Sequence, residues 1–315
     1  MHLILFDSPR RTDLLPLTYT RPVGDLRVGI LTIKEKWELW LDAPASFLTA
    51  DYLAKKFEVT YGSSNLYLYG GLLPSKDLLE ELDDNPDKAI LNETGEVLAF
   101  KSKKQFTSYE ELKKEVKNST IGKYDAIYYP YDIFLKNGQE INSDFELLTK
   151  DRKSEELSET NTLIGNNLFI EEGAQVEASI LNTSTGPIYI GKNATIMEGS
   201  VVRGPLALSD NSVLKMGAKI YGPTTLGPFC KVGGEVSNVV FQAYSNKGHD
   251  GFLGNSVIGE WCNLGADTNS SNLKNNYAPV RLWNYGNQRF VNTGLQFCGL
   301  IMGDHSKCGI NTMFN

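Results

Sequence analysis

The sequence has few cysteines, few histidines and no long apolar run, and each shortage excludes a class of protein. Its 315 residues include four cysteines, with no CxxC spacing, and three histidines. We therefore expect reduced thiols, with a disulfide set as the weaker alternative. No apolar stretch approaches the ~18–20 residues that a membrane span needs, and the N-terminus lacks the pattern of a secretory signal. These absences predict a cytoplasmic protein without a membrane span.

Surplus positive charge and several catalytic motifs are also missing. The chain has 31 Lys and Arg against 38 Asp and Glu, a formal net charge of −7. Because neutralising nucleic-acid phosphates takes an excess of basic residues, we expect no nucleic-acid partner. There is no HExxH, no paired Cys/His set and no GxSxG, so zinc-enzyme and serine-hydrolase interpretations have no support.

What is present divides the chain into two halves of different composition. Residues 1–160 hold 28 acidic and 21 basic residues, and residues 161–315 hold ten of each. Glycine is distributed oppositely to the charged residues, with 8 in the first part and 21 in the second. This contrast is typical of a charged α/β domain beside a β-solenoid. We predict an α/β domain over 1–150, a polar linker over 151–162 and a solenoid over 163–315.

A six-residue repeat in the second half is the strongest signal in the sequence. A period of six predicts a triangular parallel β-helix, in which each hexapeptide supplies a short strand and a corner and points its aliphatic side chain inward. The spacing is interrupted once and resumes with Phe252, Ile258 and Leu264. The uninterrupted run comprises Ile190, Ile196, Val202, Leu208, Leu214, Ile220, Leu226 and Val232.

Strands and helices alternate in the first half. Residues 2–6 and 66–69 are short apolar runs that predict buried strands. Ser75 and Ser108 each precede a stretch with helical spacing, so we expect them to cap helices. Alternation of this kind favours a mostly parallel sheet.

Histidine is so scarce that it narrows the search for catalytic groups. His249 lies in the segment 241–251 that interrupts the repeat, and a loop inserted into a rigid solenoid is a usual place for catalytic groups. A neutral imidazole there could take a proton from an amine or hydroxyl that attacks an acyl carbonyl. The alternative is a loop histidine that hydrogen-bonds its neighbours. We expect His305 to be a surface corner residue and His2 to have no role.

A turn with two arginines follows the first predicted strand. Residues 7–11 read Asp-Ser-Pro-Arg-Arg. Arginines after a strand suit a triphosphate cradle, since their guanidinium groups bind phosphate oxygens in pairs. The glycines that would bring the backbone close to a phosphate are missing, so a structural turn is the alternative.

Three segments carry a resemblance to a known family. Residues 245–272 (SNKGHDGFLGNSVIGEWCNLGADTNSSN) resemble the acetyltransferase core of GlmU-type enzymes, and residues 303–311 resemble the matching segment of archaeal sugar-1-phosphate nucleotidyltransferases. Residues 14–27 (LLPLTYTRPVGDLR) resemble the nucleotidyltransferase domain of Bacteroidetes-type GlmU-like proteins. The resemblance implies a Rossmann-like α/β nucleotidyltransferase domain followed by a left-handed parallel β-helix.

The resemblance implies an acetyl-transfer site in the second half. His249 falls on the general base, which accepts a proton from the glucosamine amine as the amine attacks acetyl-CoA. Asn263 and Asn272 match residues that orient the amine and the sugar. Lys215 stands where an arginine grips the sugar phosphate, which keeps the charge but loses bidentate geometry.

Further positions bear on the sugar and the coenzyme. Phe252 falls on a substrate-binding position that is usually a tyrosine, and Ser237 falls on one that is usually a lysine. Two contacts to the sugar or its phosphate would therefore be absent, which leaves the identity of the sugar open. Gly303 and Asp304 are the positions implied for binding the acetyl-CoA cofactor.

The resemblance also implies a nucleotide site in the first half. Arg10 and Arg21 match cationic positions that bind the nucleotide. Gly71 replaces a metal-binding aspartate, so Asp7 or Asp132 would have to supply a carboxylate for Mg²⁺. A domain that has lost catalysis and keeps a structural role is the alternative.

These observations leave three functional hypotheses. The first is a bifunctional transferase of nucleotide-sugar and cell-envelope synthesis that makes a UDP-N-acetylglucosamine-type product from a sugar 1-phosphate, acetyl-CoA and UTP or another NTP. The second is a nucleotidyltransferase with the β-helix as scaffold, and the third is a non-catalytic sugar-nucleotide sensor. The resemblance implies a homotrimer with acetyl-transfer sites between adjacent prisms. The repeat stops without a polar cap, so we expect either a covering subunit or a longer native chain whose further coils bind coenzyme A.

Overall fold

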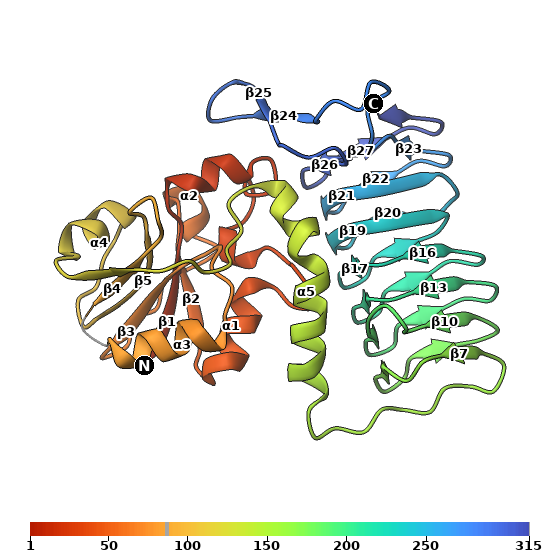
Figure 1. Ribbon diagram of the computed structural model, residues 1–315, viewed down its shortest axis with the longest axis horizontal. Helices are drawn as coiled ribbons and strands as arrows, with labels where there is room; N and C mark the ends of the chain where they lie inside the picture. Colours follow the sequence, from red (N-terminus) through yellow and green to blue (C-terminus); the bar gives the residue numbers. More distant parts are fainter. Residues whose placement is uncertain (86–87, 315) are drawn as a thin grey trace. The chain divides into compact units, whose positions relative to one another are not determined.

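A computed structural model describes residues 1–85 and 88–314 (Figure 1). The chain forms two compact units, each interrupted in sequence. The first consists of Met1–Leu26 and Leu31–Tyr129, and the second consists of Arg27–Ile30 and the chain from Pro130 onward. Within the described ranges, no helix combines the length and the apolar character that crossing a membrane would require.

The first unit is built on a mixed sheet with the strand order β2-β1-β3-β5-β4-β6. Strand β1 runs parallel to β2 and β3, and β4 runs parallel to β6, but β5 is antiparallel to both β3 and β4. The expected mostly parallel sheet is therefore only partly correct. The tight turn at Asn92–Glu96 between β4 and β5 leaves no room for a crossover helix and makes these two strands a hairpin. The strands are β1 (His2–Phe6), β2 (Ala45–Leu48), β3 (Asn65–Tyr69), β4 (Ala89–Leu91), β5 (Val97–Ser102) and β6 (Ser119–Ile121).

The helices of the first unit begin at side chains that cap them. Ser75 Oγ accepts a hydrogen bond from the Leu78 amide, and Ser108 Oγ accepts one from the Glu111 amide, which confirms both predicted helix starts. The helices are α1 (Ile33–Leu41), α2 (Asp51–Ala54), α3 (Lys76–Asp84) and α4 (Tyr109–Glu115), with 3₁₀ turns η1 (Pro9–Leu14) and η2 (Val23–Asp25).

The second unit is a stack of short parallel strands in curled sheets, the architecture of a parallel β-helix (Figure 1). One sheet includes the order β7-β10-β13-β16-β19-β17-β14-β11-β8, and another has the order β27-β22-β20-β18-β15-β12-β9. The strands are β7 (Thr162–Ile164), β8 (Leu168–Ile170), β9 (Gln175–Val176), β10 (Ile180–Asn182), β11 (Ile188–Ile190), β12 (Thr195–Ile196), β13 (Val201–Arg203), β14 (Leu206–Leu208), β15 (Val213–Leu214), β16 (Lys219–Tyr221), β17 (Thr224–Leu226), β18 (Lys231–Val232), β19 (Glu235–Ala243), β20 (Asn246–Lys247), β21 (Phe252–Glu260), β22 (Asn263–Leu264), β23 (Asn269–Ser270), β24 (Arg281–Asn284), β25 (Arg289–Asn292), β26 (Ile301–Met302), β27 (Lys307–Cys308) and β28 (Met313–Phe314).

The aliphatic repeat forms the core of this stack. All eight residues from Ile190 to Val232 that the six-residue spacing singled out are buried and pack in one cluster, which confirms the repeat. Phe252 departs from the expected register. It is half-buried, and its neighbour Leu253 occupies the interior position that pairs with Val236. The interior positions after Val232 are Val236 and Phe241, which are closer than six residues apart. The step from Leu253 to Ile258 is also only five residues, so a six-residue count back from Ile258 falls on Phe252.

The expected inserted loop at 241–251 is wrong. Strand β20 lies in the stack between β18 and β22, and β19 pairs with β21 along most of their lengths, so the chain stays in the solenoid throughout this segment. The departure from the stack comes later, at residues 271–299, where β24 and β25 form an antiparallel hairpin. The repeat broke at 241–251 because corners shortened, which a sequence spacing cannot distinguish from an insertion.

Helix α5 (Pro130–Thr149) and the short segment Arg27–Ile30 belong to the second unit. The helix contacts β17, β19 and β21. Asn137 Oδ1 accepts a hydrogen bond from the Gly29 amide at 2.8 Å, and Asp144 Oδ2 accepts one from the Ile30 amide at 2.8 Å. The compact units thus divide at Tyr129, before α5, whereas the sequence suggested a boundary near residue 150. The predicted linker contains no helix up to the start of β7.

Candidate active site

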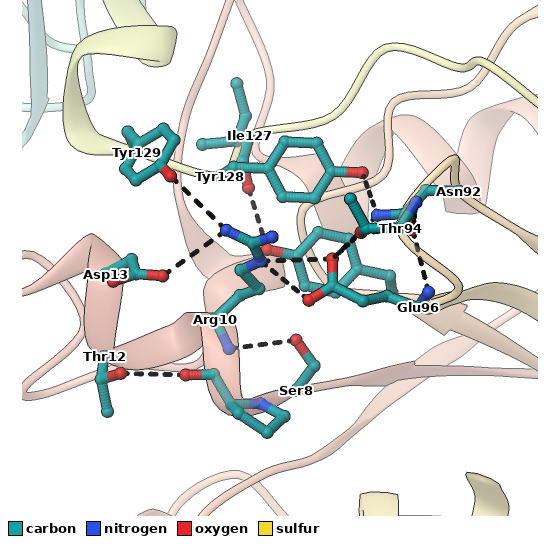
Figure 2. A network of polar contacts seen from close by, with 12 residues as sticks. Ser8, Arg10, Thr12, Asp13, Asn92, Thr94, Glu96, Ile127, Tyr128 and Tyr129 are labelled. Carbon is teal, nitrogen blue, oxygen red and sulfur yellow. Dashed lines mark hydrogen bonds and ion pairs between the residues drawn. The ribbon is translucent and has the colours of Figure 1, made fainter. Parts of the chain in front are cut away.

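The first unit places Arg10 at the centre of a polar network (Figure 2). Arg10 lies in η1, directly after β1, and its Nε donates to both carboxylate oxygens of Glu96 at 2.9 and 3.2 Å. Its guanidinium lies over the Tyr128 ring, 5.4 Å from the centroid, and Nη1 is 3.5 Å from the Tyr129 hydroxyl and 3.8 Å from Asp13. The expected phosphate-binding cation is therefore already paired.

Hydrogen bonds keep the Glu96 carboxylate ionised beside this arginine. Burial alone would raise its pKa, but hydrogen bonds from Arg10 and from Asn92 Nδ2, at 2.8 Å, bring the pKa below its usual value. The bond to Glu96 in turn raises the pKa of Arg10. A triphosphate at this position would have to compete with Glu96 for the guanidinium.

Asp7, at the end of β1, is buried and uses both of its carboxylate oxygens. Oδ1 accepts from the Val23 amide at 2.9 Å, and Oδ2 accepts from the Thr49 hydroxyl at 2.6 Å and lies 3.4 Å from Arg11 Nε. Burial, opposed by these hydrogen bonds, raises the pKa of Asp7 to about 6. Asp132, the other expected metal ligand, lies in the first turn of α5 and so in the second unit.

Arg21 and Gly71, the other two positions predicted for the nucleotide site, are both enclosed by neighbouring residues. Arg21 is buried and lies 3.7 Å from Asp25. A Cβ at Gly71 would overlap the carbonyl oxygen of Ile127 and lie 2.8 Å from the Tyr69 ring, so the backbone here has no room for the aspartate of the family pattern. Among residues 1–85 and 88–314, no three His, Cys, Asp or Glu side chains gather as a metal site would require.

The second unit carries His249 at a corner of the β-helix. The residue follows β20, and its side chain is exposed. Its carbonyl oxygen accepts a hydrogen bond from Lys247 Nζ at 2.9 Å, whereas the imidazole makes no hydrogen bond or ion pair with any residue in the described part of the chain. The imidazole is thus available to a substrate.

Lys215 lies at the same corner as His249. Lys215, Gly233 and Gly248 follow one another in successive coils, as the hydrogen bonds from the Lys215 amide to Val232 and from the Gly233 amide to Lys247 show. A Cβ at Gly233 would lie 3.1 Å from Lys215 Cβ and 3.0 Å from the Gly248 carbonyl oxygen. The structure therefore brings these two predicted residues to one edge of the solenoid, with a glycine coil between them.

Phe252 and Asn272 meet above Gly254. A Cβ at Gly254 would lie 2.6 Å from Asn272 Nδ2 and 2.6 Å from Phe252 Cζ, so the missing side chain makes space for both groups. Asn272 Nδ2 donates to Asn255 Oδ1 at 2.8 Å, and the Phe252 amide donates to Asn269 Oδ1 at 2.8 Å. The backbone of Phe252 is thus held by a side chain of the next coil, and the Asn272 side chain is held by Asn255 of the preceding coil.

The side chains of Asn263 and Asp304 form hydrogen bonds between neighbouring coils of the β-helix. Asn263 Oδ1, on β22, accepts from Asn246 Nδ2 at 3.0 Å. Asp304 Oδ1 accepts from the Glu260 amide at 2.7 Å, as Asp210 Oδ1 does from the Lys192 amide at 2.9 Å. Neither contact reaches His249.

The remaining predicted positions lie along the same stack. Gly303 follows β26, and its carbonyl oxygen accepts from Cys262 Sγ at 3.2 Å. Ser237 lies on β19 in register with Tyr221 and Gly254.

Sequence reasoning missed the groups that hold these residues. Glu96, the partner of Arg10, is 86 positions away in sequence, and no local pattern links the two. Lys247 was missed because the shortened corners hide its place in the repeat. One signal was present, since Lys247 lies two residues from the histidine that the sequence singled out.

Comparisons with known proteins agree with both halves of this description. Residues 3–153 match a family model described as sugar nucleotidyl transferase. The chain is 35% identical over 146 residues to the uncharacterized acetyltransferase YaiX of Escherichia coli O6:K15:H31 (strain 536), covering 45% of this chain and 63% of that protein. It is also 35% identical over 136 residues to YaiX of strain K12, covering 42% of this chain and 58% of that protein. The match thus spans less than two thirds of these relatives, and together the findings support a transferase.

Proposed function

We propose that this transferase is bifunctional: that the first unit transfers a nucleotidyl group from UTP or another NTP to a sugar 1-phosphate, and that the second transfers acetyl from acetyl-CoA to the amine of that sugar. The family model over residues 3–153 supports the first activity. The observation that carries the second is the unpaired, exposed imidazole of His249 on a rigid corner, among the described residues. The product is a UDP-N-acetylglucosamine-type nucleotide sugar for cell-envelope synthesis.

The chemistry of the second unit follows from three groups. The His249 imidazole accepts a proton from the amine as its nitrogen attacks the thioester carbonyl, and coenzyme A leaves as the thiol. Lys215, at the same corner, attracts the sugar phosphate as a point charge. Asn272 donates to Asn255 through Nδ2, which leaves Oδ1 to accept a hydrogen bond from the sugar.

The chemistry of the first unit depends on an exchange of partners at Arg10. The guanidinium must leave Glu96 to bind a phosphate oxygen. Arg21, the second proposed cation, is buried and lies 3.7 Å from Asp25, so it too would have to exchange partners. Both oxygens of Asp7 are engaged by protein donors, so Asp7 does not fit a Mg²⁺ site as it stands, and we assign no step to the metal. Asp132 lies in the first turn of α5. In the second unit, Gly303 and Asp304 remain the proposed acetyl-CoA contacts.

The assay follows free thiol and pyrophosphate in parallel, with glucosamine 1-phosphate, acetyl-CoA, UTP and Mg²⁺ supplied to the purified protein. His249→Ala should lower thiol release by about 10²–10⁴-fold, the usual range for a general base. Pyrophosphate release should stay intact when N-acetylglucosamine 1-phosphate and UTP are supplied, because that reaction does not need the acetyl-transfer step. His305→Ala is the matched control, because His305 is also an exposed residue at a corner of the β-helix. Unchanged thiol release in His249→Ala would refute the proposed base.

A second candidate is a nucleotidyltransferase that uses the β-helix only as scaffold. The observation that favours it is Phe252, which offers no hydroxyl to a sugar next to Asn272. Pyrophosphate release from N-acetylglucosamine 1-phosphate and UTP, without thiol release from the amino sugar, would select this candidate.

We further propose a homotrimer assembled through the β-helix. Apolar side chains are exposed on three successive strands of one sheet: Ile180 on β10, Val201 on β13 and Tyr221 on β16. Ile180 and Val201 are in register. Tyr221 lies two residues along β16 from Lys219, which stands opposite Val201. Exposed apolar side chains on neighbouring strands favour association. Sedimentation equilibrium should give three times the mass of the chain, and Val201→Glu should shift the protein toward the monomer.

A further inference from the structure

One lysine stands in the aliphatic interior of the β-helix. Lys247 pairs with Val232 on β18, and its position on β20 places it below Leu264 on β22. Its side chain is 1% exposed. The column of interior residues on these strands reads Ile196, Leu214, Val232, Lys247, Leu264 and Cys308.

The ammonium of Lys247 connects two consecutive coils. Nζ donates to the Gly233 carbonyl oxygen at 3.0 Å and to the His249 carbonyl oxygen at 2.9 Å. Gly234, at φ +74°, makes this possible, since a Cβ there would lie 2.9 Å from Nζ and 2.9 Å from Asp250 Cα. The absence of a side chain at Gly234 thus leaves room for the ammonium of Lys247.

Burial of the Lys247 ammonium carries a desolvation penalty that an aliphatic residue at this position would avoid. Burial lowers the pKa of Lys247 to about 8, and the attraction of Asp250 and Asp267 offsets only part of that effect. A buried charge is unfavourable unless its hydrogen bonds are made, and both of these bonds end on the backbone of the corner. What the lysine provides, and an aliphatic side chain would not, is a fixed carbonyl at His249.

We propose that Lys247 is a positioning residue for His249: its ammonium fixes the 247–251 corner and thereby the direction in which the imidazole leaves the solenoid. The catalytic consequence rests on the proposed acetyl transfer, whereas the geometric statement does not. Lys247 acts through the backbone and does not touch the substrate.

The test uses the scarcity of histidine. With three histidines in the chain, the ring carbon–proton signals of ¹³C-histidine-labelled protein are few enough to assign by His→Ala variants. Lys247→Met keeps the length and removes both donors, and it should shift or broaden the His249 signal while leaving His2 and His305 unchanged. The matched control is Lys231→Met, which removes an exposed lysine from the preceding coil and should move none of the three signals.

Acetyl transfer supplies the second measurement. In Lys247→Met, kcat for thiol release should fall at least tenfold, while KM for the sugar phosphate changes less than threefold and pyrophosphate release is unchanged. If the wild-type protein shows no acetyl transfer, the proposed function fails, and the histidine spectrum alone still decides the role of Lys247. An unmoved His249 signal in a folded Lys247→Met protein overturns the inference.

A measurement on the unaltered protein covers the case in which Lys247→Met does not fold. In ¹⁵N-lysine-labelled protein at pH 6, the buried ammonium should give a slowly exchanging Nζ signal with a nuclear Overhauser contact to the Hα of His249. Absence of that contact would overturn the inference.

Discussion

Asn137, on α5, offers the sharpest test of how the second unit is held together. The side chain is fully buried, and Oδ1 accepts hydrogen bonds from the Gly29 amide at 2.8 Å and from Thr225 Oγ1 at 3.0 Å. Replacing Asn137 with alanine removes both acceptor contacts. The backbone of Arg27–Ile30 would then lose one of its attachments to α5.

The expected loss can be worked out bond by bond. The Thr225 hydroxyl also donates to the Gly29 carbonyl at 2.9 Å, so it stays satisfied without Asn137. The Gly29 amide is left as a buried donor without an acceptor, which costs about 1–3 kcal/mol. Asn137 Nδ2 is buried and has no hydrogen-bond partner among the described residues, so its removal offsets part of this destabilisation. The cavity left by the shortened side chain adds to the destabilisation. We expect a net destabilisation of about 2 kcal/mol.

Urea unfolding followed by tryptophan fluorescence measures this loss, because Trp261 and Trp283 report on the second unit and Trp37 and Trp40 on the first. The control is Asn142→Ala, which removes an exposed asparagine from the same helix. Asn142→Ala should change the free energy of unfolding by less than about 0.5 kcal/mol. If Asn137→Ala behaved like the control, the segment Arg27–Ile30 would not be anchored as described.

Four further outcomes follow from the structure. Burial raises the pKa of Asp7 to about 6, above its usual value of about 4, so the folded state binds the proton more tightly and this contribution to stability falls as pH rises from about 4 to 6. Asp7→Asn should remove a difference of up to about 3 kcal/mol in thermal unfolding across that range. Gly71→Asp should unfold the first unit and bind no Mg²⁺ by calorimetry, since its Cβ overlaps the Ile127 carbonyl. Leu208→Ala, in the solenoid core, should cost about 2–5 kcal/mol in urea unfolding. Glu96→Gln should tighten UTP binding, and weaker binding would contradict the competition for Arg10.

Short-range patterns were the predictable part of the fold. The six-residue repeat identifies interior residues because each coil repeats the same local geometry, and Ser75 and Ser108 mark helix starts because a cap acts on an amide three residues away. The register of Phe252 and the antiparallel β5 were not predictable in this way. A shortened corner and a hairpin return are set by backbone pairing between strands, which side-chain spacing does not record.

The candidate site divides along the same line. His249 and Lys215 could be singled out from sequence, and the stacking of coils brings them to one corner. Two pairings could not be predicted from sequence. Arg10 and Glu96 are 86 residues apart, and Asp304 is 44 residues from Glu260, whose amide it accepts a hydrogen bond from. Charge in a sequence does not show whether another residue already neutralises it.

The membership of Arg27–Ile30 in the second unit has a consequence for synthesis of the chain. These four residues leave the ribosome early, yet Asn137, Thr225 and Gln242, which bind them, are made more than a hundred residues later. The contacts that Thr225 and Gln242 make with this segment therefore form only when residues from both ends of the chain come together. A fragment that starts after α5 would lack both α5 and the segment that Thr225 and Gln242 bind, so it would not contain the whole second unit.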